Sequence, residues 1–233
     1  MNSLFSINQL TYQRVGREQT DVLVLDEFLS DLDAVRQQAL EAGAFGPDGV
    51  TAYPGVRSDF PREWSARIVE VLNPLLRKSY KIPLNLKPTV ALAYFSLLTT
   101  PASKLKIQQC MPHIDTSRQY YYAILLYLNN GDFGGTGFFC HRPTGFERIT
   151  EEKRPIYNQS SLAFMATRGL PEPQYIAGSN QHYEMIGQVD YRKNRLAVYP
   201  GNLLHSALVD ESRDLGDDPA TKRLTANIFI EYK

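Results

Sequence analysis

Residues 110–130 read CMPHIDTSRQYYYAILLYLNN, and this stretch decides how the rest of the chain is interpreted. Its second half is dominated by aromatic and large aliphatic residues, which is typical of a buried strand. Alternate residues of a strand point to the same face, so His113 and Asp115 are expected to lie side by side. A metal site needs a third ligand, and His205 in RLAVYPGNLLHSALVD offers one. Two histidines and one carboxylate on one face of a metal suit non-haem Fe(II) chemistry.

The composition bounds the kind of protein. With 233 residues the chain is long enough to bury a sizeable core as one large domain or two small ones. Lys+Arg and Asp+Glu both number 25, so the zero net charge gives no footprint for nucleic acid or an anionic membrane. Two cysteines are too few for a disulfide framework. We see neither a signal peptide nor a membrane span, and we expect a soluble, cytoplasmic protein of undetermined oligomeric state.

The N-terminal part contains two expected helices. The first covers 31–42, with Ser30 as its N-cap and Gly43 as its stop. The second covers 61–80 and presents an apolar stripe, and Pro74 is expected to kink or divide it.

Two further features of this part have less regular patterns. Residues 21–25 predict a strand, and residues 46–60 predict a long loop rich in glycine and proline. Within the loop, Tyr53 and Arg57 of YPGVR either reach a substrate or belong to a structural turn.

From residue 89 onward the sequence predicts short strands, separated by a polar insert at about 142–182 that could be helical over 150–166. The acidic run 210–218 is expected to be a solvated loop. The expected strands are 89–100, 105–107, a segment around 113, 121–128, 136–141, 184–191, 195–199, 203–208 and 223–232. Helices followed by many short strands indicate an α+β fold, with the helices packed on one side of an antiparallel β structure.

The last strand carries polar residues on one face. In RLTAN, Arg223, Thr225 and Asn227 share a face because side chains alternate along a strand. A guanidinium and a hydroxyl can hold a carboxylate through charge-assisted hydrogen bonds, so this face suits a small dicarboxylic acid. The alternative is the solvent-facing side of an edge strand.

Taken in order, these motifs resemble a known enzyme family. HIDTSRQYYYAILLYLNNGDFGGTGFF, RLAVYPGNLLHSALV and KRLTANIFI are similar to the Fe(II)- and 2-oxoglutarate-dependent dioxygenases, in their prolyl-hydroxylase-like branch. The opening segment DVLVLDEFLSDLDAVRQQAL is similar to how that branch begins, and YPGVR resembles a little-characterised bacterial subgroup. The resemblance covers nearly the whole chain.

The resemblance implies a double-stranded β-helix, a jelly-roll barrel, braced by N-terminal helices. It implies one oxygenase domain over 1–233, with mainly helical support in 1–87 and a barrel core in 88–233. The insert at 142–182 would then cover the mouth of the active site. Arg223 follows His205 by 18 residues, longer than is usual in the family, and we interpret the excess at 210–220 as a surface loop.

The resemblance also implies the roles of individual residues. His113, Asp115 and His205 would bind iron, Arg223 would pair with the distal carboxylate of 2-oxoglutarate, Tyr127 or Thr225 would assist it, and Asn227 would lie near the cosubstrate or a bound water. The cofactors would be Fe(II), 2-oxoglutarate as cosubstrate and O2. The reaction would couple oxidative decarboxylation of 2-oxoglutarate to hydroxylation of an amino acid, a peptide or protein side chain, or a small metabolite. Asp115 favours hydroxylation over halogenation, because the related halogenases lack the carboxylate ligand.

Two other functions remain open on the sequence. The first is a cupin-like metal oxygenase that uses the same triad without 2-oxoglutarate. The second is a catalytically silent barrel that serves as a binding protein, since a fold does not fix a function. His141 and His182 have no partner at metal spacing and are expected to be surface or hydrogen-bonding residues.

Overall fold

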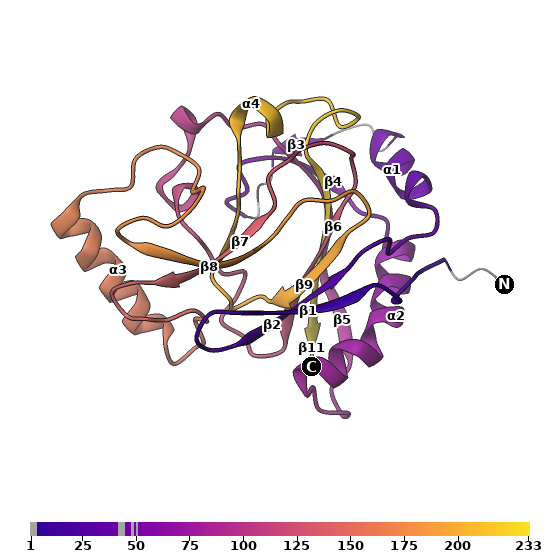
Figure 1. Cartoon of the computed structure of the whole chain (residues 1–233), viewed down its shortest axis with the longest axis horizontal. Helices are drawn as coiled ribbons and strands as arrows, with labels where there is room; N and C mark the ends of the chain where they lie inside the picture. Colours follow the sequence, from indigo (N-terminus) through magenta and orange to yellow (C-terminus); the bar gives the residue numbers. More distant parts are fainter. Residues whose placement is uncertain (1–3, 42–44, 48, 50) are drawn as a thin grey trace.

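The computed structural model describes residues 4–41, 45–47, 49 and 51–233. Within them the chain forms an eight-stranded sheet and a three-stranded sheet in which every pairing is antiparallel. The larger sheet has the order β1-β2-β9-β6-β11-β5-β4-β3 and the smaller β10-β7-β8 (Figure 1). The elements are β1 (Leu10–Val15), β2 (Thr20–Leu25), α1 (Leu32–Glu41), β3 (Gly46–Pro47), β4 (Gly55–Asp59), α2 (Arg62–Tyr80), β5 (Pro88–Leu98), η1 (Ala102–Lys104), η2 (Ile107–Cys110), β6 (Tyr121–Tyr127), β7 (Thr136–His141), α3 (Arg154–Arg168), β8 (Tyr183–Val189), β9 (Leu196–Pro200), β10 (His205–Ala207), α4 (Glu211–Asp214) and β11 (Leu224–Tyr232).

Helices α1 and α2 cover one face of the larger sheet. Leu32, Val35 and Ala39 of α1 are buried at helical spacing, and Ile68 and Leu72 continue the pattern on α2. These side chains join one apolar core with the inner strands. In Figure 1 both helices lie on the same side of the molecule, at the opposite end from α3.

The other face of the larger sheet packs against the smaller sheet, and β6 explains how one strand serves both sides. Ile124 and Leu126 belong to the core under the helices, whereas Ala123 and Leu125 belong to a second core shared with Phe138 of β7. Because consecutive side chains of a strand point to opposite faces, a strand that lies between two cores is apolar throughout. All seven residues of β6 are buried.

The expected α+β class with antiparallel sheets is confirmed, and most expected strands are present. Three segments differ. Residues 105–107 do not form a strand, since Ile107 begins the 3-10 helix η2. The segment around His113 forms an isolated bridge and no regular strand. Residues 46–60 are not a plain loop, because they contain β3 and β4, and β4 pairs with β5.

The N-terminal helices also differ in detail from the expectation. Asp31, not Ser30, accepts from the backbone of α1, at 3.0 Å from Ala34 N, while Ser30 Oγ donates to Leu4 O. The expected stop at Gly43 lies outside the described residues. Helix α2 is undivided at Pro74, which removes only one backbone donor from a helix whose buried face continues on both sides. Beside these two helices, the first 87 residues contribute strands β1 to β4.

Two later segments contain helices: the insert, where a helix was expected, and the acidic run, where a solvated loop was expected. Helix α3 confirms the expected helix in the insert. The acidic run contains the short helix α4, and Asp214 is fully buried there because its carboxylate accepts from Gly134 N at 2.9 Å and Asp210 N at 2.8 Å. Hydrogen bonds to backbone N–H groups replace the water that a solvated loop would have supplied.

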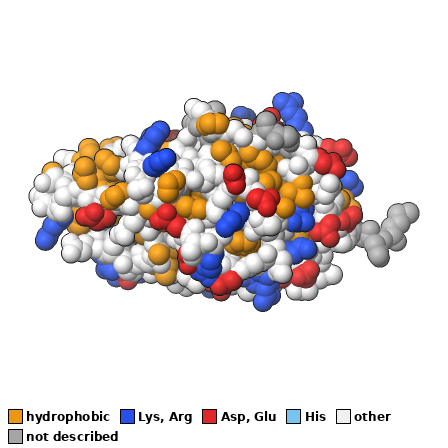
Figure 2. Space-filling view, turned by 90° about the horizontal axis from the view of Figure 1, so that it is seen from above, with side chains coloured by type: hydrophobic (Ala, Val, Ile, Leu, Met, Phe, Trp, Pro, Cys, Tyr) orange, Lys and Arg blue, Asp and Glu red, His pale blue; other side chains and the backbone are white. Residues whose placement is uncertain are grey.

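The surface agrees with the balanced composition. Figure 2 shows acidic and basic side chains interspersed over the face seen from above. Among the described residues, no helix is both long and apolar enough to cross a membrane. Cys110 and Cys140 are both buried and free.

Candidate metal centre

Backbone pairing brings His113, Asp115 and His205 together. His113 N donates to His205 O and His205 N to His113 O, each at 2.9 Å, and Asp115 N donates to Gly201 O at 2.8 Å. A Cβ at Gly201 would lie 2.6 Å from the ring of Tyr121 and 3.4 Å from Asp115, so glycine permits this close approach. The extended segment around His113 is thereby fixed against the end of β10.

The three side chains converge with their donor atoms. One ligand atom from each of His113, Asp115 and His205 lies within 4.8 Å of the others, and these residues could hold a metal ion. His205 Nδ1 donates to Leu203 O at 2.8 Å, which fixes the tautomer that leaves a lone pair on Nε2. That Nε2 lies 3.8 Å from Asp115 Oδ1. Asp115 Oδ2 is buried and has no hydrogen-bond partner among the described residues, as a carboxylate kept for a cation would be.

The protein surroundings set the charges of the three groups. His113 is an exposed residue that lines both cavities, yet desolvation by the surrounding protein lowers its pKa to about 4, and the neighbouring His205 adds to the lowering. Burial also lowers the pKa of His205 to about 4 and raises that of Asp115 to about 6. Both imidazoles are therefore neutral at pH 7, the form in which histidine binds metals. Two neutral nitrogens and one carboxylate match the donor set of a non-haem Fe(II) centre.

Arg223 is a buried cation at the same site. Only 3% of the residue is exposed, and its Nε donates to Gly134 O at 2.7 Å. Its Nη2 lies 3.4 Å from Gly135 O. No carboxylate of the described residues forms an ion pair with it. A guanidinium has five N–H donors, so donors remain for an anion.

Of the other residues expected to hold the cosubstrate, two line the cavity beside Arg223 and the third, Tyr127, does not. Thr225 and Asn227 line the same cavity as Arg223, and Asn227 Nδ2 donates to Ser96 Oγ at 2.6 Å. Tyr127 is fully buried behind them, its hydroxyl lies 2.9 Å from Thr136 Oγ1, and its ring centroid is 5.9 Å from the guanidinium carbon. The geometry thus places Thr225 in the cavity wall and Tyr127 in the layer that supports it.

Two cavities meet at the triad. The smaller cavity, of about 100 Å³, joins the triad to Arg223, Thr225 and Asn227. The larger cavity, of about 300 Å³, extends from the triad toward η2 and the loop before β4. The residues that line both cavities are Tyr53, Arg57, His113, Asp115, Ala207 and Phe229.

Sequence reasoning left some lining residues unassigned. Tyr199 lies with its ring centroid 4.8 Å from that of His205 and lines the smaller cavity. The alternation in RLAVYP, which puts Ala197 and Tyr199 on one face, could have predicted it. For Tyr53 and Arg57 the sequence left open a reach toward substrate or a structural turn, and both line the two cavities, where the pairing of β4 with β5 places them.

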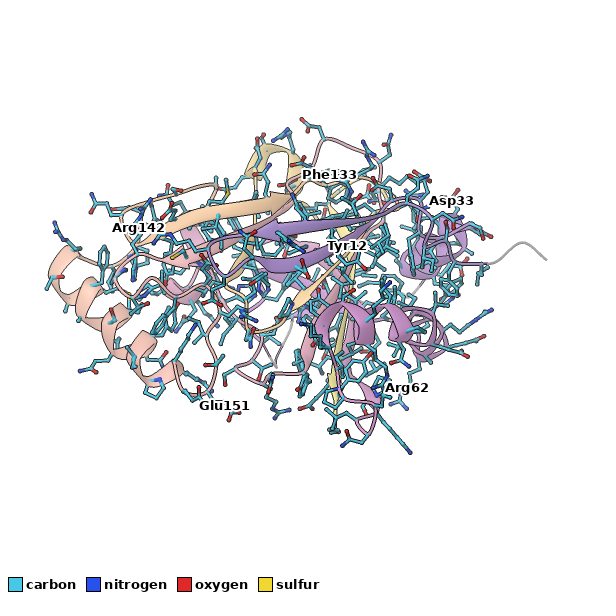
Figure 3. The ribbon with its side chains drawn as sticks, turned by 60° about the horizontal axis from the view of Figure 1, so that its bottom comes forward. Tyr12, Asp33, Arg62, Phe133, Arg142 and Glu151 are labelled. Carbon is cyan, nitrogen blue, oxygen red and sulfur yellow. The ribbon has the colours of Figure 1, made fainter. Side chains whose placement is uncertain are left out.

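The insert approaches the site through one residue. Tyr175 lines the larger cavity, and its hydroxyl donates to Thr100 O at 2.6 Å. Helix α3 lies at the end of the molecule opposite α1 and α2, with Arg142 and Glu151 labelled on the segment that leads to it (Figures 1 and 3), and none of its residues lines the larger cavity. The cavity mouth is therefore bordered by the return of the insert and not by its helix.

Comparison with known families gives one match. Residues 7–230 match the model of a family described as a family of unknown function, DUF6445. The chain belongs to this family. Among curated proteins the DUF6445 chain has no match.

Solved structures with a similar fold include three proteins. HygX from Streptomyces hygroscopicus, with iron bound, is 16% identical at a TM-score of 0.49, covering 94% of this chain and 87% of HygX. The viral collagen prolyl hydroxylase vCPH from Paramecium Bursaria Chlorella virus-1, in complex with 2-oxoglutarate, is 13% identical at 0.46, covering 90% and 94%. SnoN, a non-haem α-ketoglutarate-dependent epimerase from nogalamycin biosynthesis, is 10% identical at 0.49, covering 91% and 78%.

HygX is also described with nickel, 2-oxoglutarate and hygromycin B bound. At such identities, and with TM-scores below 0.5, the likenesses assign no activity to the DUF6445 chain. What the chain does has to follow from its own residues.

Proposed function

We propose that this protein is an Fe(II)- and 2-oxoglutarate-dependent oxygenase that hydroxylates a small molecule or a peptide. The observation that carries the proposal is the smaller cavity, which connects a two-histidine, one-carboxylate triad to the buried cation of Arg223. A metal-binding triad alone suits many enzymes. A guanidinium without an acidic partner among the described residues, at the other end of the same cavity, suits a keto acid with a second carboxylate.

The three ligand residues would hold the iron on one face and leave the opposite face open. His205 is oriented for this by its bond to Leu203 O, and Asp115 by its backbone bond to Gly201. Arg223 would bind the distal carboxylate of 2-oxoglutarate, with Thr225 and Asn227 beside it in the cavity wall. The backbone bond from Arg223 to Gly134 fixes the guanidinium before the cosubstrate arrives, which reduces the entropy lost on binding.

When bound, Fe(II) with O2 would oxidise 2-oxoglutarate to succinate and CO2, one oxygen atom entering succinate and the other becoming the hydroxyl of the product. The larger cavity would hold the substrate, since it reaches the triad from the side away from Arg223. Aliphatic and aromatic side chains such as Leu98, Ile114 and Phe229 supply much of its wall. That lining excludes water and favours a substrate with an apolar portion.

The fold that belongs to this proposal is the double-stranded β-helix. The facing of the larger and smaller sheets over a shared core supports it, as does the position of the triad between them. In this interpretation the described residues form one oxygenase domain, with α1 and α2 bracing the outer face of the larger sheet.

Oxygen-dependent conversion of 2-oxoglutarate tests the proposal. The Fe(II)-loaded protein in air is expected to form succinate even without its own substrate, and Asp115→Ala is expected to form none. Asp217→Ala, an exposed acidic residue of the α4 segment, serves as the matched control and should behave as wild type. Metal binding without succinate would favour a cupin-like oxygenase. The absence of metal binding would leave a binding protein.

A further inference from the structure

Tyr53 stands at the point where the two cavities meet, and the backbone fixes it there. Gly55 N donates to Tyr53 O at 3.0 Å, and Pro54 O accepts from Thr99 N at 3.4 Å. A Cβ at Gly55 would lie 2.1 Å from Leu97 O, so only glycine lets the loop approach β5 this closely. The YPGVR loop is therefore a pinned turn whose first side chain reaches the site.

The ring of Tyr53 forms part of a wall. The guanidinium carbon of Arg57 lies 4.3 Å from its centroid, and the ring packs with Leu98, Tyr175 and Val209. Tyr53 lines both the smaller and the larger cavity. Its side chain thus borders both the proposed cosubstrate space and the proposed substrate space.

The hydroxyl of Tyr53 is a buried donor that no described residue accepts. Its oxygen has no hydrogen-bond partner, although it is closed off from solvent. Leaving a buried hydroxyl unsatisfied destabilises the fold, and phenylalanine would fill the same volume without that cost. A tyrosine in this place is explained if a ligand accepts its proton.

The electrostatic surroundings indicate which ligand. Burial raises the pKa of the Tyr53 hydroxyl, and the charge of Arg223 opposes this rise more than that of Arg57 does. Arg57 lies over the ring of Tyr53, yet Arg223 lowers the pKa of the hydroxyl more than Arg57 does. Tyr53 and Arg223 both line the smaller cavity, so a keto acid bound to Arg223 would occupy a space that Tyr53 borders.

We infer that the Tyr53 hydroxyl donates to the distal carboxylate of the keto acid, as a second donor beside Arg223. The inference rests on the proposed function, because it needs a keto acid in the smaller cavity. An O–H to carboxylate bond is charge-assisted and stronger than one between neutral groups. The ring of Tyr53 also lines the larger cavity and contacts Arg57. A hydrogen bond from its hydroxyl to the keto acid would therefore fix this part of the wall of the substrate cavity.

Tyr53→Phe tests this by removing only the hydroxyl. Calorimetric titrations of Mn(II)-loaded protein would compare 2-oxoglutarate with 2-oxopentanoate, a keto acid of the same length that lacks the distal carboxylate. The Kd of 2-oxoglutarate is expected to rise about ten- to a hundredfold in the variant. The Kd of 2-oxopentanoate is expected to stay unchanged.

Tyr94→Phe is the matched control. Its ring lies 5.0 Å from the same guanidinium carbon of Arg57, but it is not among the residues that line either cavity. It should bind both keto acids as wild type does. Thermal unfolding of each variant, with a midpoint close to that of wild type, shows that the fold is intact.

Three outcomes would overturn the inference. Equal weakening of both keto acids by Tyr53→Phe would mean a structural effect on the site. No weakening of either, with wild-type binding that requires Arg223, would remove Tyr53 from the keto-acid site and leave the proposed function standing. If wild type binds no 2-oxoglutarate, the proposed function and the inference both fail.

Discussion

Two pairs of histidines in this molecule have similar spacing and similarly lowered pKa values, and they differ in what their side chains contact. His113 and His205 have ring centroids 4.4 Å apart, and His141 and His182 have theirs 4.9 Å apart. The protein surroundings lower the pKa of each of the four to about 4, although His113 is exposed and the other three are buried. Neither separation nor charge state therefore distinguishes a candidate metal centre from a structural cluster.

The difference lies in what the ring nitrogens contact. His141 Nε2 and His182 Nε2 hydrogen-bond each other at 2.9 Å, and His141 Nδ1 lies 2.7 Å from Thr144 Oγ1. The ring of Phe164 stacks on His182 at 4.1 Å. This pair satisfies itself and packs against the insert.

At the triad, by contrast, side-chain lone pairs are left over. His205 binds the backbone through Nδ1 only, and Asp115 keeps a buried oxygen without a partner among the described residues. A carboxylate accompanies the histidines there, whereas His141 and His182 belong to no group of the described residues that could hold a metal ion. Unpaired lone pairs aimed at a cavity are what distinguish the triad histidines as a candidate binding site.

The largest expected effect comes from removing a triad ligand. His205→Ala should weaken Fe(II) binding by at least about a hundredfold, since even residues that only orient a ligand contribute ten- to a hundredfold. Anaerobic metal titration measures it. His182→Phe is the control and should keep one equivalent of tightly bound iron. Iron binding that survives His205→Ala would contradict the assignment of the triad.

Arg223→Met should have the next largest effect. Loss of the cation that faces the keto acid is expected to raise the Kd of 2-oxoglutarate about a hundredfold, with unchanged metal affinity. Calorimetry on Mn(II)-loaded protein gives both values. Arg118→Met, which removes an exposed arginine paired with Glu231, is the matched control. Equal keto-acid affinity in the two variants would exclude Arg223 from the site.

His182→Phe should lower stability without touching the metal. The change leaves His141 Nε2 without its partner, so the free energy of unfolding is expected to fall by about 1–3 kcal/mol. Urea unfolding at pH 7 measures this. An unchanged stability would mean that the mutual hydrogen bond contributes nothing to the fold.

The stability of His182→Phe relative to wild type is also expected to depend on pH. Because burial lowers the pKa of His141 and His182 to about 4 from 6.5, the unfolded chain binds more protons between these values. Stability from this pair is complete above pH 6.5 and is lost as pH falls toward 4. The stability gap between wild type and His182→Phe should therefore be smaller at pH 4.5 than at pH 7. A gap that stays constant or widens on acidification would contradict this account of the pair.

The smallest effect separates the two residues that the sequence left equivalent. Thr225→Val is expected to raise the Kd of 2-oxoglutarate about fivefold, because its hydroxyl lies in the wall of the smaller cavity. Tyr127→Phe should have a smaller effect, since its hydroxyl is already bonded to Thr136. Calorimetry on the two variants, with thermal unfolding as the control for folding, decides between them. A larger effect of Tyr127→Phe would reverse the assignment.

Much of the fold could be predicted from the sequence. Strands between two cores, such as β6, are apolar throughout, and in helices that cover a sheet the apolar residues recur every three to four positions. The candidate ligands were also predictable, since His113 and Asp115 are close in sequence and His205 lies in a strand-like segment. The structure places these three residues together through backbone pairing. Their roles remain proposals.

The remaining features depend on contacts between distant segments. The segment around His113 is extended only because it pairs with His205, so no local pattern could define it as a bridge. Tyr53 reaches the cavities because β4 pairs with β5 and Gly55 permits the approach. The carboxylate of Asp214 accepts from the backbone N–H groups of Gly134 and Asp210, and the acidic sequence around it gives no sign of this burial.

Anaerobic addition of 2-oxoglutarate to the Fe(II)-loaded protein tests the central claim most directly, by the visible metal-to-ligand charge-transfer band of a keto acid bound through two atoms. The account predicts that the band forms in wild type and in His182→Phe, needs far more 2-oxoglutarate in Arg223→Met, and is absent in His205→Ala. A wild-type protein that binds iron and shows no band at saturating 2-oxoglutarate would contradict it.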